Sequence, residues 1–211
     1  MTNRAETIGW QAELLVRNIL EREELNTVIH NSMADADDPM IGISLHGRDF
    51  RIPLPDLCIT KRGGTLLTAR QQAKTWYVEV KAKTCFGNFE NGSLLTTGFD
   101  NWNLECYQRL AEECGQLVEV YFVHIFPLAE AKKVVSRSEA PAGIYKADIQ
   151  VLYENRWRPP FNTDLAYWPV MNSVLELVVP MAELIQAPDT SRRVAELQRI
   201  AKRDCRFDLG L

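Results

Sequence analysis

Two short stretches of the chain place charged residues where apolar side chains predominate. In "LPDLCIT", residues 54–60, Asp56 precedes an apolar run, and in "WYVEVKAK", residues 76–83, Glu79 and Lys81 interrupt one. A charge inside a strand-like segment is costly unless it is paired or bound to a metal ion. These three residues therefore either find charged partners in the folded chain or form a functional site.

The chemistry open to these residues is that of a hard divalent cation. Strand side chains alternate, so Glu79 and Lys81 emerge on one face and Val80 on the other. The carboxylates of Asp56 and Glu79, with the backbone carbonyl of Val80, are oxygen ligands of the kind that Mg²⁺ prefers. Such an ion polarises a phosphoryl oxygen and lowers the pKa of its bound water. Lys81 would orient that water or offset the negative charge that builds up on phosphorus.

The elements that must position these residues follow from the apolar patterning of the chain. Helical spacing of apolar residues predicts helices, and runs of β-branched and aromatic residues predict strands. The predicted elements are helices over 5–23, 101–114 and 191–203, strands over 26–30, 56–60, 75–83 and 117–126, a hairpin over 41–54, and strand-like segments over 143–153 and 174–179.

The domain organisation is predicted from length and from where the pattern weakens. A chain of 211 residues with 46% hydrophobic residues can bury one substantial core. We expect residues 1–126 to form that core and residues 127–211 to form a C-terminal α+β extension packed on it, in the same domain or as a small subdomain. The connection over 84–101 is rich in Gly, Asn and Thr and is predicted as a long, functional loop.

Composition excludes several classes of protein. The net charge of −4 argues against indiscriminate coating of nucleic acid, so any such contact must be focused. The five cysteines contain no Cys-x-x-Cys pair, which argues against a disulfide framework or a zinc knuckle. The sequence has no apolar run of membrane-spanning length and no secretory signal pattern at its start. We therefore expect a cytoplasmic protein that does not enter a membrane.

Pro55-Asp56, followed by Glu79-Val80-Lys81 on a later strand, resembles the signature of the PD-(D/E)XK nuclease superfamily. The superfamily includes restriction-type endonucleases and archaeal Holliday-junction resolvases. The resemblance covers about residues 5–126. It implies an α/β fold with a restriction-endonuclease-like core, in which helices flank a central mixed β-sheet in αβββαβ order.

The same resemblance implies an activity. Its members hydrolyse phosphodiester bonds with a bound metal, so a Mg²⁺-dependent nuclease acting on nucleic acid is expected here. We expect DNA as the substrate, an endonuclease mode of cutting, and Mn²⁺ as a substitute for Mg²⁺. Many relatives pair to cut both strands, which leaves a homodimer open.

Further site residues are implied by the resemblance. An acid on the first helix often joins the metal site, and Glu13 stands at that position, with Glu6 as the alternative. Some branches carry a Gln or Tyr on the second helix close to the site. Tyr107 and Gln108 are the candidates here, although their spacing departs from the better-defined Gln/Tyr motifs.

Basic residues near the two strands could extend a positive rim towards a nucleic acid. Lys83, Lys61 and Arg62 are candidates for this contact, although a lysine at a strand end often serves solubility.

Two alternatives stand beside the nuclease interpretation. The three charges could be solvated groups at strand edges, or the chain could keep the nuclease fold as a non-catalytic nucleic-acid-binding or protein-interaction module. The acidic balance and the basic face of the final helix motivate the second alternative. The complete set of two acids and one lysine favours catalysis.

Overall fold

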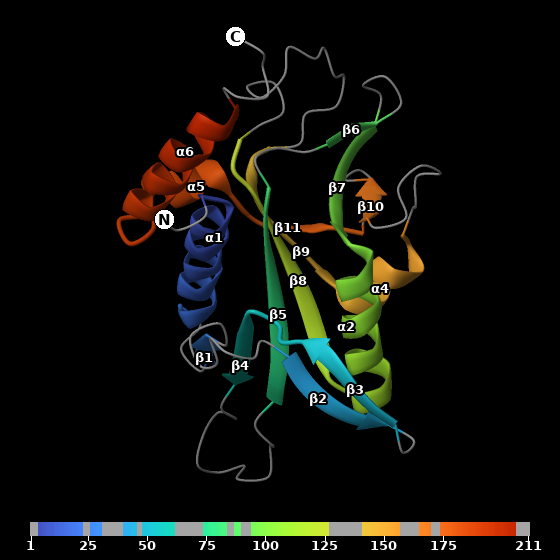
Figure 1. Cartoon of the computed structure of the whole chain (residues 1–211). Helices are drawn as coiled ribbons and strands as arrows, with labels where there is room; N and C mark the ends of the chain where they lie inside the picture. The colour runs from blue at the N-terminus through green and yellow to red at the C-terminus, as the bar shows by residue number, and fades with distance from the viewer. Residues whose placement is uncertain are drawn as a thin grey trace.

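The chain folds around a central six-stranded sheet with helices on both faces (Figure 1). This computed structural model describes residues 4–22, 26–30, 40–45, 48–61, 74–83, 87–89, 94–126, 141–156, 165–169 and 174–205. The strands of the sheet, in spatial order, are β1 (Asn26–His30), β4 (Leu57–Lys61), β5 (Lys74–Lys83), β8 (Leu117–His124), β9 (Gly143–Asp148) and β11 (Glu176–Pro180).

The strand pairings are antiparallel except between β5 and β8, which run in parallel from Trp76 opposite Leu117 to Lys83 opposite His124. A parallel pair needs a long crossover. That crossover contains helix α2 (Asn101–Cys114). Helix α1 (Arg4–Glu21) precedes the sheet, and β1, β4 and β5 form an antiparallel meander before α2 and β8. The predicted fold class and its αβββαβ order are confirmed.

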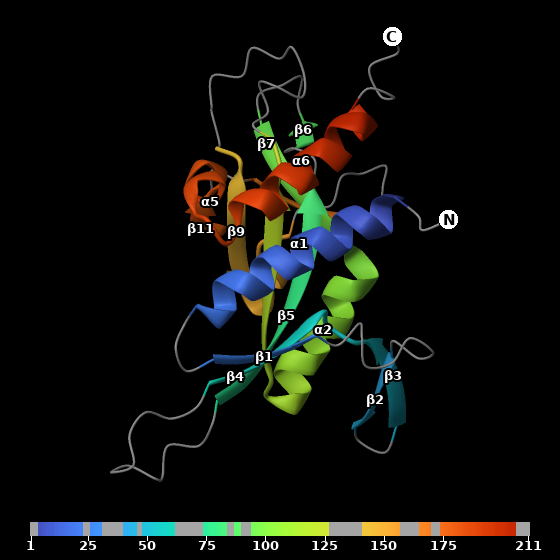
Figure 2. The same cartoon turned by 90° about the vertical axis from the view of Figure 1, so that its left-hand side faces the viewer.

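The sheet separates two hydrophobic layers. Helices α1, α5 (Met181–Gln186) and α6 (Ser191–Cys205) lie on one side in Figure 1, and α2 and α4 (Ile149–Glu154) lie on the other. In Figure 2, α1 and α6 cross the strands side by side. Along β5, Trp76, Val78 and Val80 belong to the layer under α1, whereas Tyr77 packs into the layer under α2. The alternation expected of a strand therefore decides which β5 side chains face α2.

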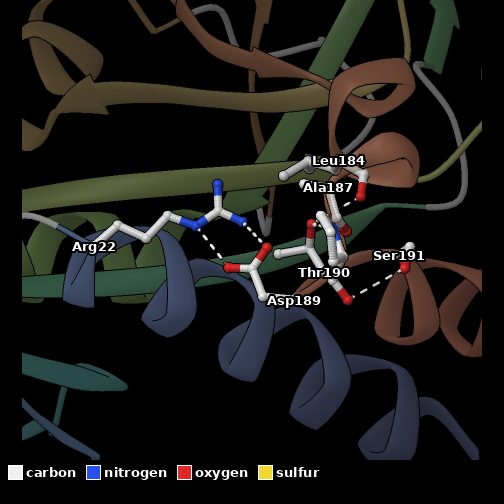
Figure 3. Close-up of polar contacts among 7 residues, drawn as sticks. Arg22, Leu184, Ala187, Asp189, Thr190 and Ser191 are labelled. Atoms are coloured by element: carbon white, nitrogen blue, oxygen red, sulfur yellow. Dashed lines mark hydrogen bonds and ion pairs between the residues drawn. The ribbon is translucent and has the colours of Figure 1, made fainter.

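Polar contacts fix α6 beside α1 (Figure 3). Arg22, just after α1, donates from Nε and Nη2 to the two carboxylate oxygens of Asp189, at 2.9 and 2.6 Å. The buried hydroxyl of Thr190 donates to the carbonyl of Leu184 at 2.7 Å and closes the turn between α5 and α6. The C-terminal helix is thus tied to the first one.

Two smaller sheets flank the central one. Strands β2 (Met40–Leu45) and β3 (Arg48–Pro53) pair as the predicted hairpin. Strand β7 (Leu94–Asp100) pairs with β6 (Gly87–Phe89) and with β10 (Leu165–Pro169). The prediction of a loop over 84–101 is therefore wrong in part, because most of that segment is β6 and β7. Pairing with β10, which lies far along the chain, supplies the order that the local composition did not indicate.

The segment over 143–153 also differs from its prediction. It begins as strand β9 but turns at Asp148 into helix α4, where the Asp148 carboxylate accepts a hydrogen bond from the Gln150 N–H at 2.7 Å. This side-chain cap starts a new helix within a β-rich sequence. Strands β9 and β11 extend the sheet beyond β8, so residues after 126 lie in the same sheet as β5. Within the described residues, no helix has the length and apolar character needed to cross a bilayer.

Candidate functional site

The pairing of β4 with β5 places Asp56 and Glu79 next to each other. Leu57 pairs with Val78, so the next position of the antiparallel register sets Asp56 opposite Glu79. Asp56 lies in the bend just before β4, one residue outside the strand that was predicted to include it. Its Oδ2 accepts a hydrogen bond from the Val80 N–H at 2.7 Å. This bond holds the carboxylate against the middle of β5.

Glu79 and Lys81 form an ion pair on the face of β5 that points towards α2. The Lys81 Nζ lies 2.5 Å from Glu79 Oε1, and the hydroxyl of Tyr107 on α2 donates to Glu79 Oε2 at 2.8 Å. Glu79 is 3% exposed. A buried carboxylate needs such partners, because burial without them costs several kcal/mol. Both Glu79 oxygens are thus engaged.

Aromatic rings from β7 and α2 complete the surroundings of Lys81. The Lys81 Nζ lies 5.3 Å from the centroid of the Phe99 ring, within the range of a cation–π contact. Phe99 stacks on Tyr107, with ring centroids 6.1 Å apart and planes 19° apart. Asp100, the next residue, caps α2 by accepting a hydrogen bond from the Asn103 N–H at 3.0 Å. The junction between β7 and α2 therefore sets the position of both rings.

The site has an excess of negative charge. Burial, followed by the charges of Glu79 and Glu13, holds the pKa of Asp56 well above its usual range, although Lys81 and the Val80 N–H oppose this. Burial alone would lower the pKa of Lys81, but Glu79, Asp56 and Asp100 outweigh it and raise that pKa above its ordinary value. Lys81 therefore stays protonated at neutral pH, and one amine faces several carboxyl groups.

The donor chemistry of the site fits a divalent metal ion. Carboxylate oxygens of Asp56, Glu79 and Glu13 are the ligands that Mg²⁺ prefers, and an added cation would offset their mutual repulsion. The side chains as placed do not surround one point, however. Among the described residues, no group of three or more His, Cys, Asp or Glu side chains is arranged to hold an ion. In the observed arrangement, Glu79 is neutralised by Lys81 instead.

The first-helix acid lies close enough to act on Asp56. Glu13 is half-buried on α1, and its charge contributes to the raised pKa of Asp56. The alternative acid, Glu6, is exposed in the first turn of the same helix. Of the two, Glu13 is the residue whose charge Asp56 senses.

Only some of the other predicted site residues lie near Lys81 and Tyr107. Lys83 is half-buried on the same face of β5 as Lys81, and Gln108 is buried beside Tyr107 on α2. Lys61 pairs with Lys74 at the end of the β4–β5 ladder that lies away from Asp56. Lys61 is therefore not brought to the site, and Arg62 lies outside the described residues.

Residue patterning alone missed two members of the cluster and underestimated a third. Phe99 and Asp100 lie in the segment predicted as a loop, and Tyr107 is predicted near the site only through a motif whose spacing it does not match. A signal was present for Asp100, because an aspartate directly before a helical pattern is a typical N-cap. For Tyr107 the signal was its place on the apolar face of a helix, where its hydroxyl needs a partner.

No protein-family model and no curated protein matches this chain. Among solved structures, two chains match. One is Hjc, a Holliday junction resolvase from the archaeal hyperthermophile Archaeoglobus fulgidus, determined at 1.6 Å resolution. The alignment covers 80% of this chain and 94% of Hjc, with 15% identical residues and a TM-score of 0.31. That TM-score is too low to support a conclusion about fold or activity, so the fold described above rests on its own element order and strand pairing.

Proposed function

We propose that the chain is a metal-dependent nuclease of the PD-(D/E)XK type that hydrolyses phosphodiester bonds in DNA, with an endonuclease mode of cutting. The observation that carries this proposal is the juxtaposition of Asp56, Glu79 and Lys81 by the β4–β5 ladder. Two acids and one amine, held by β5 and by the bend before β4, suit a reaction in which charge develops on a phosphate.

Asp56, Glu79, the backbone carbonyl of Val80 and Glu13 would hold the ion, with Mg²⁺ as the expected metal and Mn²⁺ as its substitute. A bound divalent ion supplies Lewis-acid polarisation and a more acidic water. The residues of the chain supply the rest. Tyr107 holds the Glu79 carboxylate through one oxygen, so that its direction is fixed.

Lys81 acts through its charge in this proposal and not as a base. Its pKa lies above the ordinary value for lysine, because Glu79, Asp56 and Asp100 outweigh the effect of burial. A lysine that stays protonated donates hydrogen bonds and cannot accept a proton from water. Lys81 would therefore stabilise the negative charge that builds up on the phosphate or hold the attacking water by donation.

Cleavage assays test the proposal directly. Purified protein with Mg²⁺ or Mn²⁺ is incubated with linear, branched and single-stranded DNA, and we expect products from at least one of these. Lys81→Ala and Glu79→Gln should abolish cutting while the folded circular-dichroism spectrum is kept. Lys74→Ala, a change at the far end of the same strand, is the matched control and should cut like the parent. Cutting by Lys81→Ala would refute the mechanism.

Metal binding is tested separately by thermal unfolding. Mn²⁺ should raise the Tm of the parent protein, because an ion that binds only the folded state stabilises it. Asp56→Asn removes one of the three carboxylates and should lose most of that shift. A Tm that is unchanged by Mn²⁺ in the parent would remove the metal from the proposal.

A second candidate function is favoured by the pairing within the site. Both oxygens of Glu79 have protein partners, Lys81 and Tyr107. A non-catalytic nucleic-acid-binding or protein-interaction module would have this property. DNA binding that persists in EDTA, with no product after long incubation with metal, would support that function. The expected cytoplasmic location and the homodimer stay predictions.

A further inference from the structure

Lys83, the last residue of β5, carries a charge that no described residue neutralises. Its backbone is fixed, because Lys83 pairs with His124 on β8 and its carbonyl accepts a hydrogen bond from the Ile125 N–H at 3.0 Å. Its side chain is half-buried, and no hydrogen bond or ion pair joins its amine to another described residue. A partly buried charge without a partner is unfavourable, so its position suits a ligand of opposite charge.

The groups that face Lys83 explain its electrostatics. Lys81 lies on the same face of β5, His124 is its buried neighbour on β8, and the Tyr145 ring on β9 meets His124 edge-on at 5.7 Å. Burial, together with the charge of Lys81, lowers the pKa of Lys83 to about 8. Burial raises the pKa of Tyr145 to about 12, so Tyr145 stays neutral below pH 10.

We propose that Lys83, beside Lys81, forms a phosphate-binding site at this end of β5, which holds a backbone phosphate of the nucleic acid next to the phosphate that lies at Asp56, Glu79 and Lys81. Residues two apart on a strand face the same way and are separated by about 6.6 Å along it. The Lys81 amine is held by Glu79, so Lys83 is the amine left to meet the ligand.

The need for such a site follows from the charges around it. A phosphate that approaches Asp56 and Glu79 also meets the fields of Glu13 and Asp100, which act on Asp56 and Lys81. A second amine beside Lys81 offsets that repulsion over the short distances at which it matters. This inference rests on the proposed function for the identity of its ligand, a phosphodiester backbone.

Binding in EDTA separates this inference from cleavage. A fluorescent DNA of the form that the parent cuts best, or binds best if none is cut, is titrated with parent, Lys83→Ala, Lys83→Arg and Lys74→Ala proteins at pH 7. Lys83→Ala should weaken binding and reduce the slope of log affinity against log salt by about 1, as expected for one lost phosphate contact. Lys83→Arg and Lys74→Ala should bind like the parent.

Repeating the titration at pH 9 adds a readout that a structural role would not move. The parent should lose affinity by up to about tenfold between pH 7 and pH 9, since a group with a pKa of about 8 loses most of its proton there. Lys83→Arg should resist this loss, because arginine stays charged. Lys74→Ala should follow the parent, and Lys83→Ala should change less with pH than the parent.

The outcomes distinguish the two proposals. If the parent binds DNA and Lys83→Ala binds as tightly with an unchanged salt slope, the phosphate site is refuted and the nuclease proposal stands. If the parent never cuts but its binding still depends on Lys83, the nuclease proposal fails and the phosphate site stands. A parent protein that binds no DNA at either pH overturns the phosphate site.

Discussion

At the scale of single residues, Glu79 is the best-supported side chain of the candidate site. It receives one contact from its own strand, through Lys81, and one from α2, through Tyr107. Buried carboxylates survive in folded proteins when such contacts replace water. The tyrosine hydroxyl is the contact that can be removed without removing a charge.

Tyr107→Phe tests that contact. The substitution keeps the ring that stacks on Phe99 but removes the donor to Glu79, so we expect a loss of about 1–2 kcal/mol in the free energy of unfolding. On the proposed function it should also slow cutting by roughly tenfold, since Glu79 would be less firmly directed. Denaturant unfolding and single-turnover cleavage measure the two effects.

Tyr153→Phe on α4 is the matched control for Tyr107→Phe. Tyr153 is half-buried, and the Arg156 guanidinium packs on its ring. It should leave cutting unchanged. A Tyr107→Phe protein with parental stability and parental cutting would show that the hydroxyl contributes nothing to either.

Lys83 gives a pH-dependent prediction about stability. Its pKa is lowered from 10.5 to about 8 by burial and by Lys81, so charging it disfavours the folded state below pH 8. As pH rises from 8 towards 10.5, the unfolded chain holds the proton that the folded chain has lost, and stability increases. Lys83→Met should therefore raise the free energy of unfolding at pH 7, by up to about 3 kcal/mol.

Urea unfolding of parent and Lys83→Met proteins at pH 7 and pH 10 measures this effect. The advantage of Lys83→Met should shrink to about 1 kcal/mol at pH 10, where the parent side chain is already neutral in the folded state. Lys74→Met, at an exposed position of the same strand, should change little at either pH. An advantage that does not depend on pH would point to packing and not to charge.

The sequence was informative at this scale where spacing along one strand decides the geometry. Glu79 and Lys81 share a face because they are two residues apart, and that prediction needs no tertiary information. The proximity of Phe99, Asp100 and Tyr107 depends on how β7 and α2 return to the sheet. Local patterning cannot show that return.

At the scale of elements, helix ends are set by local chemistry that the sequence displays. Gly115 follows α2 with φ of 63°, a left-handed conformation that a residue with a side chain adopts only at a cost. The helix predicted over 101–114 is confirmed with the same bounds. Apolar periodicity also predicts α1 and α6, and runs of β-branched and aromatic residues predict β1, β4, β5 and β8, to within a few residues.

Gly115→Ala should lower the free energy of unfolding by about 1 kcal/mol, because alanine is strained at positive φ. Gly9→Ala offers the opposite case. Gly9 lies inside α1 with open space where a Cβ would be placed, so alanine should stabilise the protein by about 0.5–1 kcal/mol. Thermal unfolding of both variants checks the sign of each effect. Destabilisation by both would contradict the interpretation.

Elements were missed where their order comes from distant partners or from a single cap. Strand β7 contains glycine and threonine, so its sequence predicts a loop. It nevertheless pairs with β10, more than sixty residues later. Helix α4 continues a β-rich stretch, and the Asp148 cap starts it. Neither feature has an apolar period long enough to be recognised from the sequence.

At the scale of the whole molecule, the C-terminal third is part of the main sheet. Strand β9 pairs with β8 from Gly143 opposite His124 to Asp148 opposite Glu119, and Val194, Leu197 and Ala201 of α6 fill the layer under α1. Gly143 lies so close to β11 that a Cβ there would be 2.7 Å from the Val179 carbonyl oxygen. The pairing of β9 with β8 and the packing of α6 against α1 couple the two predicted halves of the chain.

A truncated chain of residues 1–126 should therefore fail to fold cooperatively. It would leave β8 as an open edge with largely apolar faces, and it would remove the helix that packs against α1. Circular dichroism, proton NMR dispersion and thermal unfolding of the fragment check this. Asp189→Ala in the full chain is the mild comparison, since an exposed ion pair contributes little to stability. A fragment with a sharp unfolding transition would establish residues 1–126 as an independent domain.

The acid at the centre of β5 brings its own counter-charge, two residues further along the same strand. The chain can therefore bury Glu79 without a bound metal ion, and a chelator should leave the fold intact. If the nuclease proposal holds, folding of the chain and activation by a metal ion are separate events. Newly made protein would then fold fully and stay inactive until a divalent cation binds. The local concentration of such cations would control when cutting begins.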